Sequence, residues 1–310
     1  MLALAAGAGA LHAEEPLAVL AQPGKEQAAA RLSAIRKVTL SQDPLAVRAL
    51  AAAYARLEAD PQSGFSPLEK IAILQALETH RERGAGPCAC KALTDPSREV
   101  RRAALSALRQ VRDSQAVPGL VSLIEQAGSE DRVRAHEDLA IAQEASDLLE
   151  VLANRSLHYA ALSGSGERQI AVTRWRQWWE ANRQLPRSTW QIQGFHDEHL
   201  TVTLPLEAAG IPPLLEALAD ARPAWIRENA QELLAAIPTP PASPAGGRID
   251  QPACAALAKG LAHADPGVQR RAASLLHHIL SAGGHGDLPS PSDRDFPEGM
   301  QTWWTAHGAS

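Results

Sequence analysis

The hydrophobic residues of segment 95–111 follow the period of an α-helix. Asp95 can cap a helix by accepting a backbone N–H bond, and Pro96 suits a first turn because its φ angle is preset. The apolar positions recur at three- and four-residue steps, which places them along one stripe: Val100, Ala103, Ala104, Ala107, Leu108 and Val111. Segment 87–93 predicts a shorter partner helix, so the two segments together predict a helical hairpin.

The same pattern recurs along the chain. A single helical hairpin cannot bury its own apolar face, so a stable fold needs further copies that stack on it. Each copy has a β-branched residue four positions before an alanine, a spacing that puts both side chains on one helix face. The further copies are Asp43-Pro44 with Val47 and Ala51, Asp220 with Ile226 and Ala230, and Asp265-Pro266 with Val268 and Ala272. We therefore expect these residues to hold structural repeat positions: Asp95, Val100, Arg101, Ala104, Ile226, Ala230, Asp265, Val268 and Ala272.

An opening of Asp-Pro, then Val-Arg and a run of alanines, resembles the second helix of the HEAT repeat family. The resemblance includes the short variant named after phycobilisome lyases. The last copy departs from it, because Gln269 stands where the arginine is expected. The resemblance implies a right-handed α-solenoid of about five to six helical hairpins. It also implies that Arg101 and Arg227 pair with a turn aspartate of the same or an adjacent repeat.

The periodicity predicts HEAT-like repeats over residues 25–154 and again over residues 207–281, with a Pro-rich linker at 238–247. Within the first set, segments 25–40 and 44–57 are expected to pair as one hairpin. The tail, residues 282–310, is turn-rich and expected to be mobile until its terminal Trp segment.

Tryptophans mark two expected caps. Trp175, Trp178 and Trp179 share one side of a predicted helix over residues 168–183. We interpret this helix as a cap that closes one stack of repeats, and a ligand-binding aromatic box is the alternative. Trp303 and Trp304 are the candidates for a C-terminal cap.

Residues 188–204 carry a β pattern in the middle of the chain. Trp190, Ile192 and Gly194 alternate with polar residues, as do Leu200, Val202 and Leu204. We expect an all-α fold with this one inserted β-hairpin. Its tip would hold His196-Asp197-Glu198-His199, but neighbouring side chains on a strand or turn point in different directions, so we expect a solvated tip and no metal.

Composition narrows the class of protein further. The chain is 45% hydrophobic but 4% aromatic, with 22 prolines, which is typical of closely packed helices punctuated by turns. Its formal net charge of −5 disfavours a general nucleic-acid binder. We find no apolar run long enough to span a membrane. The cysteines suggest packed thiols rather than a metal or disulfide framework: Cys88, Cys90 and Cys254.

Residues 1–13 resemble the apolar core and small-residue exit of a secretory signal peptide, although the first Lys or Arg is Lys25. This predicts a periplasmic or secreted protein. The alternative is an N-terminal helix that packs on the first repeat of a cytoplasmic protein.

No catalytic motif occurs, so we expect no catalytic residue and no cofactor. The leading hypothesis is a non-enzymatic scaffold whose second helices line a concave face that binds a protein or peptide. The residues proposed for that face are Arg102, Arg109, Arg112, Arg227, Glu228, Gln231 and Arg271. One alternative is a chromophore-handling lyase, which the family resemblance implies. Another is nucleic-acid binding by the arginine-rich helix 97–112.

Overall fold

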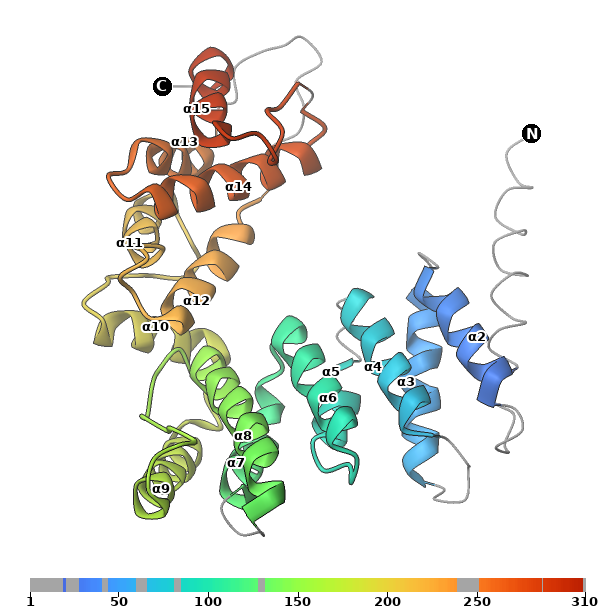
Figure 1. Ribbon diagram of the computed structural model, residues 1–310. Helices are drawn as coiled ribbons and strands as arrows, with labels where there is room; N and C mark the ends of the chain where they lie inside the picture. Colours follow the sequence, from blue (N-terminus) through green and yellow to red (C-terminus); the bar gives the residue numbers. More distant parts are fainter. Residues whose placement is uncertain are drawn as a thin grey trace, which may run out of the picture. The chain divides into compact units, whose positions relative to one another are not determined.

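The structure is a computed structural model that describes residues 19–20, 28–40, 44–59, 66–80, 85–127, 132–238, 251–285 and 287–308. Its regular elements, within those ranges, are helices (Figure 1). The chain divides into two compact units, and each is described by itself. Unit 1 comprises Met1–Leu152 and Leu157–Ala181, and unit 2 comprises Ala153–Ser156 and Asn182–Ser310.

Several predictions from the sequence fall outside the described residues. They are the signal peptide at residues 1–13, the aspartate of the Asp43 copy, and all of the linker 238–247 except Pro238. Within the ranges that the structure covers, no helix has the length and apolar content needed to cross a membrane.

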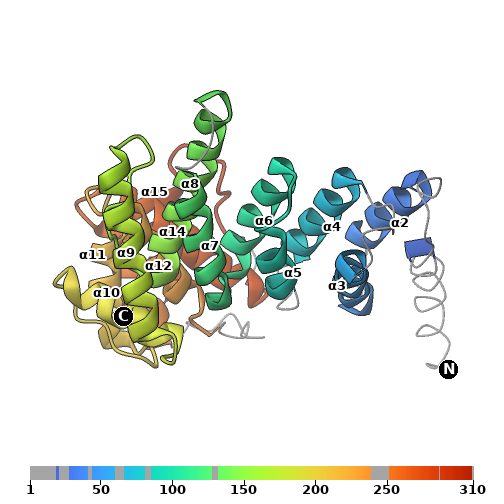
Figure 2. The same cartoon turned by 90° about the horizontal axis from the view of Figure 1, so that it is seen from below.

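Unit 1 is built from two layers of helices. Its elements are α2 (Ala28–Leu40), α3 (Pro44–Ala59), α4 (Pro67–His80), α5 (Ala85–Ala92), α6 (Arg98–Val111), η2 (Ser114–Ala116), α7 (Val117–Gln126), α8 (Arg132–Ala153) and α9 (Ser165–Asn182). In one layer α2 packs on α4 and α4 packs on α6, while α3 and α5 contact each other in the second layer. Figure 2 shows α2, α4 and α6 as a row with α3 and α5 on one side of it.

The pairing of the first helices differs from the expected one. Helix α3 pairs with α4 and contacts α5, so it lies in the layer of first helices, and α2 lies beside α4 in the row of second helices. The proline that opens α3 therefore marks a helix start without specifying its layer. The physical reason is that proline suits the first turn of any helix.

Helix α6 follows the predicted stripe closely. Its buried residues are Val100, Ala104, Leu105, Ala107 and Leu108. The N-cap is Ser97, whose hydroxyl accepts from the Val100 amide at 3.4 Å, while Asp95 Oδ1 accepts from the Ser97 amide at 2.8 Å. Asp95 therefore orders the turn before the helix, and the serine caps the helix itself.

Unit 2 repeats the hairpin plan. Its elements are α10 (Arg187–Asp197), η3 (Ala208–Gly210), α11 (Ile211–Ala217), α12 (Ala224–Ala235), α13 (Pro252–Ala258), η4 (Lys259–Ala262), α14 (Pro266–Ala282) and α15 (Phe296–His307). Helices α11 and α12 form one hairpin, and α13 and α14 form the next, with α12 packed on α14. Helix α15, in the segment expected to be a tail, packs on α14 and η4.

The β-hairpin predicted over residues 188–204 is wrong, because most of this segment is helix α10. The buried residues are Trp190, Gln191, Gly194 and Phe195. The first two lie four residues before the last two, so all of them share one helix face. Gly194 belongs to the alternating pattern that suggested a strand, but packing and not strand structure explains the glycine. A Cβ on Gly194 would lie 1.8 Å from the carbonyl oxygen of Asn154, so close backbone packing requires the glycine.

Candidate functional site

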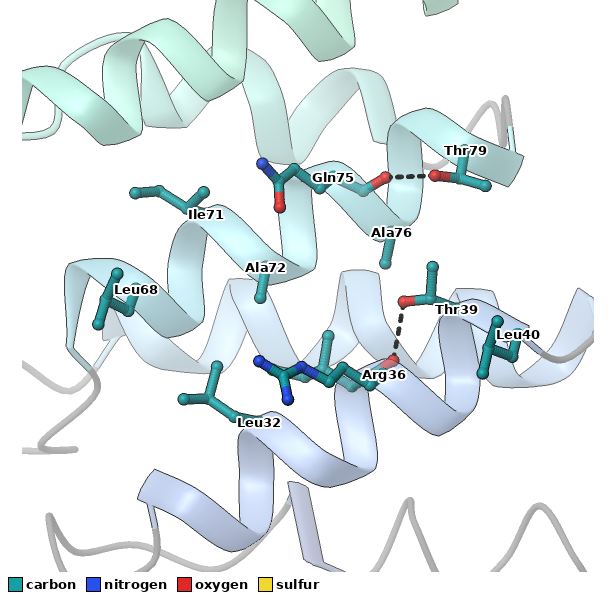
Figure 3. Close-up of a pocket in the computed structure, with 11 residues that line it drawn as sticks. Leu32, Arg36, Thr39, Leu40, Leu68, Ile71, Ala72, Gln75, Ala76 and Thr79 are labelled. Carbon is teal, nitrogen blue, oxygen red and sulfur yellow. Dashed lines mark hydrogen bonds between the residues drawn. The ribbon is translucent and has the colours of Figure 1, made fainter.

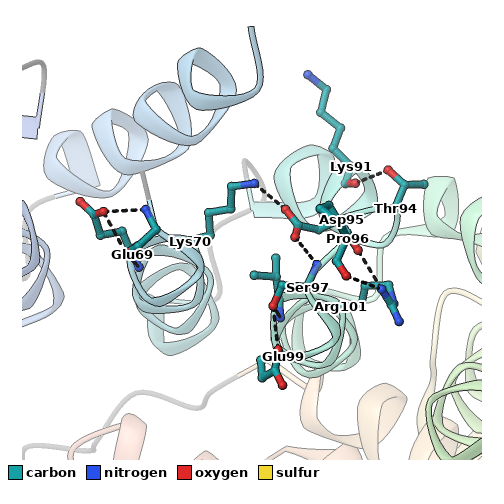
Figure 4. Close-up of polar contacts among 11 residues, drawn as sticks. Glu69, Lys70, Lys91, Thr94, Asp95, Pro96, Ser97, Glu99 and Arg101 are labelled. Carbon is teal, nitrogen blue, oxygen red and sulfur yellow. Dashed lines mark hydrogen bonds and ion pairs between the residues drawn. The ribbon is translucent and has the colours of Figure 1, made fainter. Parts of the chain in front are cut away.

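The turn before α6 shows how the repeats use their charged residues (Figure 4). Lys70 of α4 binds Asp95 Oδ2 with its Nζ at 2.5 Å. Arg101 donates from Nη1 to the main-chain oxygens of Asp95 at 2.9 Å and Pro96 at 3.2 Å. Both cations therefore stabilise the turn between α5 and α6.

The same device recurs in unit 2 with a different side chain. Arg227 donates to the main-chain oxygens of Asp220, at 3.2 Å, and Arg222. Gln269, which departs from the family pattern, donates from Nε2 to the main-chain oxygen of His263 at 2.6 Å. The residue after the β-branched position thus bonds to turn carbonyls in each case, where the resemblance implied a pairing with a turn aspartate.

Turn aspartates instead link neighbouring hairpins in unit 2. Arg271 of α14 binds Asp220 Oδ1 at 2.5 Å and donates to the main-chain oxygen of Leu218 at 2.7 Å. Asp265 caps α14 and accepts from the Asp220 amide at 3.1 Å. These N–H bonds, with that of Asp220 the strongest, lower the pKa of the Asp265 carboxyl. Arg271, proposed as a partner-binding residue, therefore joins one hairpin to the next.

Arginines in the first half of α6 face carboxylates of α8. Arg98 Nε and Arg101 Nη2 each lie 3.4 Å from Asp138 Oδ1. Arg102 is exposed, and its Nε lies 3.3 Å from Glu144 Oε1. The other proposed contacts are half-buried: Arg109, Arg112, Glu228 and Gln231. Most of the arginines of α6 thus make contacts inside unit 1.

The tryptophans divide between buried and partly exposed positions. Trp175 and Trp178 of α9 are buried in a T-shaped contact with ring centroids 5.7 Å apart. Trp179 is half-buried and lines a hollow of about 270 Å³ between α7 and α9, beside an ion pair of Arg176 and Glu125. On α15, Trp303 is buried and stacks on His307, and Trp304 is half-buried.

Neither cysteine with a shifted pKa resembles a catalytic nucleophile. Burial, assisted by the charge of Asp113 and by Cys88, raises the pKa of Cys90 to about 12. Burial raises the pKa of Cys254 to about 11. Reactive cysteines have lowered pKa values, so these thiols stay protonated at neutral pH. Within the described residues, no group of three or more His, Cys, Asp or Glu side chains could hold a metal ion, including at the 196–199 tetrad that ends α10.

An apolar groove lies between α2 and α4 of unit 1 (Figure 3). It has a volume of about 620 Å³. The lining residues are Leu32, Ile35, Arg36, Thr39, Leu40, Leu68, Ile71, Ala72, Gln75, Ala76 and Thr79. Leu40 is 84% exposed and Leu68 is 67% exposed. Single exposed leucines are common on protein surfaces, but a contiguous apolar surface such as this groove is typical of an interaction site.

Specific contacts hold the two walls of the groove in register. Near its start, Arg31 Nε of α2 binds Glu69 Oε1 of α4 at 2.7 Å, and both side chains are 0% exposed. Near its end, the His80 ring Nε2 lies 3.0 Å from the main-chain oxygen of Thr39. The N-terminal ends of the two helices lie together, as do their C-terminal ends, so α2 and α4 run parallel. Parallel second helices are what stacked hairpins produce.

Glu69 also fixes the start of α4. Its Oε2 accepts from the Ser66 amide at 2.8 Å and from the Ser66 hydroxyl at 3.0 Å. In return, the Ser66 hydroxyl accepts from the Glu69 amide at 3.4 Å, which completes a capping box. One carboxylate therefore sets both the first turn of α4 and its contact with α2.

The polar groups of the groove are few. The hydroxyls of Thr39 and Thr79 donate to main-chain oxygens of their own helices, those of Ile35 and Gln75, each at 2.8 Å. These two hydroxyl donors are therefore already used within their own helices. Arg36 and Gln75 are exposed and supply the side-chain polarity of an otherwise apolar surface.

The sequence pattern did not predict this groove, because helical periodicity alone does not show which apolar faces the neighbouring helices leave open. A usable signal existed in α4, whose apolar residues surround the helix instead of forming one stripe. A helix that is apolar on more than one face needs cover on more than one face.

The comparison with family models agrees with this architecture. Residues 62–140 match the family model described as HEAT repeats, a match that includes α4, α5 and α6. The chain is therefore a helical repeat protein. More particularly, residues 62–140 are similar to HEAT repeats, as the resemblance predicted.

A crystal structure described as that of an engineered protein is similar to the chain at 18% sequence identity and a TM-score of 0.30. It covers 93% of this chain and 76% of its own. The comparison with curated proteins found no match.

Proposed function

We propose that this HEAT-repeat scaffold binds a partner protein through the groove between α2 and α4. The observation that carries the proposal is the exposure of Leu40 and Leu68 at the rim of a groove of about 620 Å³. Burying such side chains contributes about 1.5–3 kcal/mol each, which favours a protein contact.

The proposed site lies elsewhere on the row of second helices than the arginines expected from the sequence. Helices α2 and α4 lie in the same layer as α6, the helix expected to line the binding face. Arg102 remains exposed on that layer and could contact a large partner at its edge, despite its ion pair with Glu144. The arginines of unit 2 that bind turns are better explained by repeat structure.

Neither alternative function gains a specific observation. Nucleic-acid binding needs cations that are available to phosphates, whereas Arg98, Arg101 and Arg102 lie beside carboxylates of α8. A lyase reading rests on the family resemblance alone, and fold does not fix function.

Partner recovery from the source cells tests the proposal. We compare the full chain with Leu40→Asp and Leu68→Asp, after confirming native helix content and melting temperature. Leu162→Asp is the matched control, because Leu162 is 83% exposed and does not line the groove. We expect both groove variants to lose a partner that the control retains. Unchanged recovery with the groove variants would reject the proposed site.

A further inference from the structure

We propose that the occupant of the α2–α4 groove is an acidic amphipathic helix of the partner protein. This inference rests on the proposed function and specifies its ligand. Its basis is the combination of an apolar floor, two parallel helical walls and a cation that has no internal partner in the described structure. An amphipathic helix laid in a hydrophobic groove is a recurring mode of recognition.

Charge supplies the first argument. Arg36 lines the groove, Lys37 follows it on α2, and neither has an ion-pair partner among the residues that the structure describes. The lining residues in Figure 3 include no carboxylate. Other cations of unit 1 do lie beside acidic groups: Lys70, Arg98, Arg101, Arg102 and Arg176. An acidic ligand would therefore complement the charge of this groove.

Length supplies the second argument. The groove follows α4 from Leu68 to Thr79, which is about 16 Å at the rise of an α-helix. About three turns of a partner helix fill that length. The exposed leucines mark its two ends, because Leu68 lies in the first turn of α4, Leu40 ends α2, and the two helices are parallel.

The position of Arg36 then places the acidic residue of the ligand. Figure 3 shows Arg36 between Leu32 and Leu40 along α2, with Gln75 on the opposite wall. The ligand would place apolar anchors at i, i+3 and i+7 against the floor. Its carboxylate would lie near the middle, on the flank that faces α2. Arg36 can then form charge-assisted hydrogen bonds at the edge of an apolar contact.

Fluorescence anisotropy with designed peptides tests this assignment. One peptide of about three turns carries leucines at i, i+3 and i+7 with glutamates on a flank, and a matched peptide has lysines in their place. We expect the full chain to bind the glutamate peptide about tenfold more tightly than the lysine peptide. Arg36→Glu should reverse that preference. Arg270→Glu makes the same charge change on α14 of unit 2, on an exposed side chain, and should leave the preference unchanged.

Several results would overturn the inference. Equal affinity for the two peptides, or no binding of either, would remove the acidic helix as the ligand. A dimer in sedimentation that Leu68→Asp dissociates would assign the groove to a second copy of this chain. Binding to phosphatidylserine vesicles without peptide binding would assign it to a membrane surface. If Leu68→Asp still abolishes partner recovery while the peptides fail, the proposed function survives and the acidic helix does not.

Discussion

At the scale of single residues, a few side chains carry several structural tasks at once. Glu69 completes the capping box of α4 and binds the buried Arg31 of α2. Gly194 allows a backbone approach that no side chain permits. Such positions are where single substitutions should have effects that are large and interpretable.

Glu69→Gln separates the two tasks of this carboxylate. Glutamine can still complete a capping box, but it leaves the buried Arg31 guanidinium without a carboxylate. We expect the free energy of unfolding to fall by about 3–5 kcal/mol, the typical cost of breaking a buried ion pair. Urea unfolding and hydrogen exchange of α2 and α4 measure the change. Glu144→Gln removes the exposed pair with Arg102 and should cost less than about 1 kcal/mol. Equal effects would refute this account of Glu69.

Gly194→Ala tests the packing of α10. The new Cβ would meet the Asn154 carbonyl oxygen at 1.8 Å, so the backbone must shift and stability should fall by about 1–3 kcal/mol. Gly164→Ala is the matched control, because its Cβ would meet nothing within 4 Å. Thermal unfolding of both variants gives the comparison. A stable Gly194→Ala variant would contradict the close approach.

The thiols predict how stability depends on pH. Cys254 ionises near pH 9.0 when unfolded, but burial raises its folded pKa to about 11. Folding therefore favours the protonated thiol. Its contribution to the free energy of unfolding is complete below pH 9 and is lost as the pH rises towards 11. We expect the stability difference between the wild-type chain and Cys254→Ala to shrink over that interval. A difference that is constant or grows with pH would contradict the burial of this thiol.

At the scale of elements, the sequence predicted helices well where one stripe faces the core. The α6 stripe is an example, since Val100, Ala104 and Leu108 recur at helical spacing and are buried. The prediction failed at α10, where Trp190, Ile192 and Gly194 happen to alternate. Alternation over so few residues fits both periods, and only the approach of Asn154 explains the glycine. Contacts of that kind are set by tertiary packing, which local periodicity does not contain.

Gln269 predicts an exchange between two side chains at one position of the repeat. Its Nε2 bonds to a turn carbonyl, as arginine does at positions 101 and 227. We expect Gln269→Arg to preserve stability within about 0.5 kcal/mol and Gln269→Ala to lower it by about 1 kcal/mol, the net value of a typical hydrogen bond. Chemical denaturation distinguishes the two. Equal loss in both variants would show that the position is not interchangeable.

At the scale of the whole molecule, stacked hairpins account for both the stability and the candidate site. Within each unit, second helices pack on their neighbours in the row, and this stacking buries the apolar core of that unit. The repeat pattern predicted this class of protein, and the match over residues 62–140 confirms it. The groove could not be predicted in the same way, because the exposure of Leu40 and Leu68 depends on which faces of α2 and α4 the neighbouring helices leave open.

The most direct test of the central claim is site-specific photo-crosslinking in the source cells. A photoreactive residue replaces Leu68 in the groove or Leu162 outside it, and both sites are exposed. The account predicts a discrete crosslinked partner from position 68, lost when Leu40→Asp is added, and no such product from position 162. The same product from both positions, or none from position 68, would contradict a binding groove between α2 and α4.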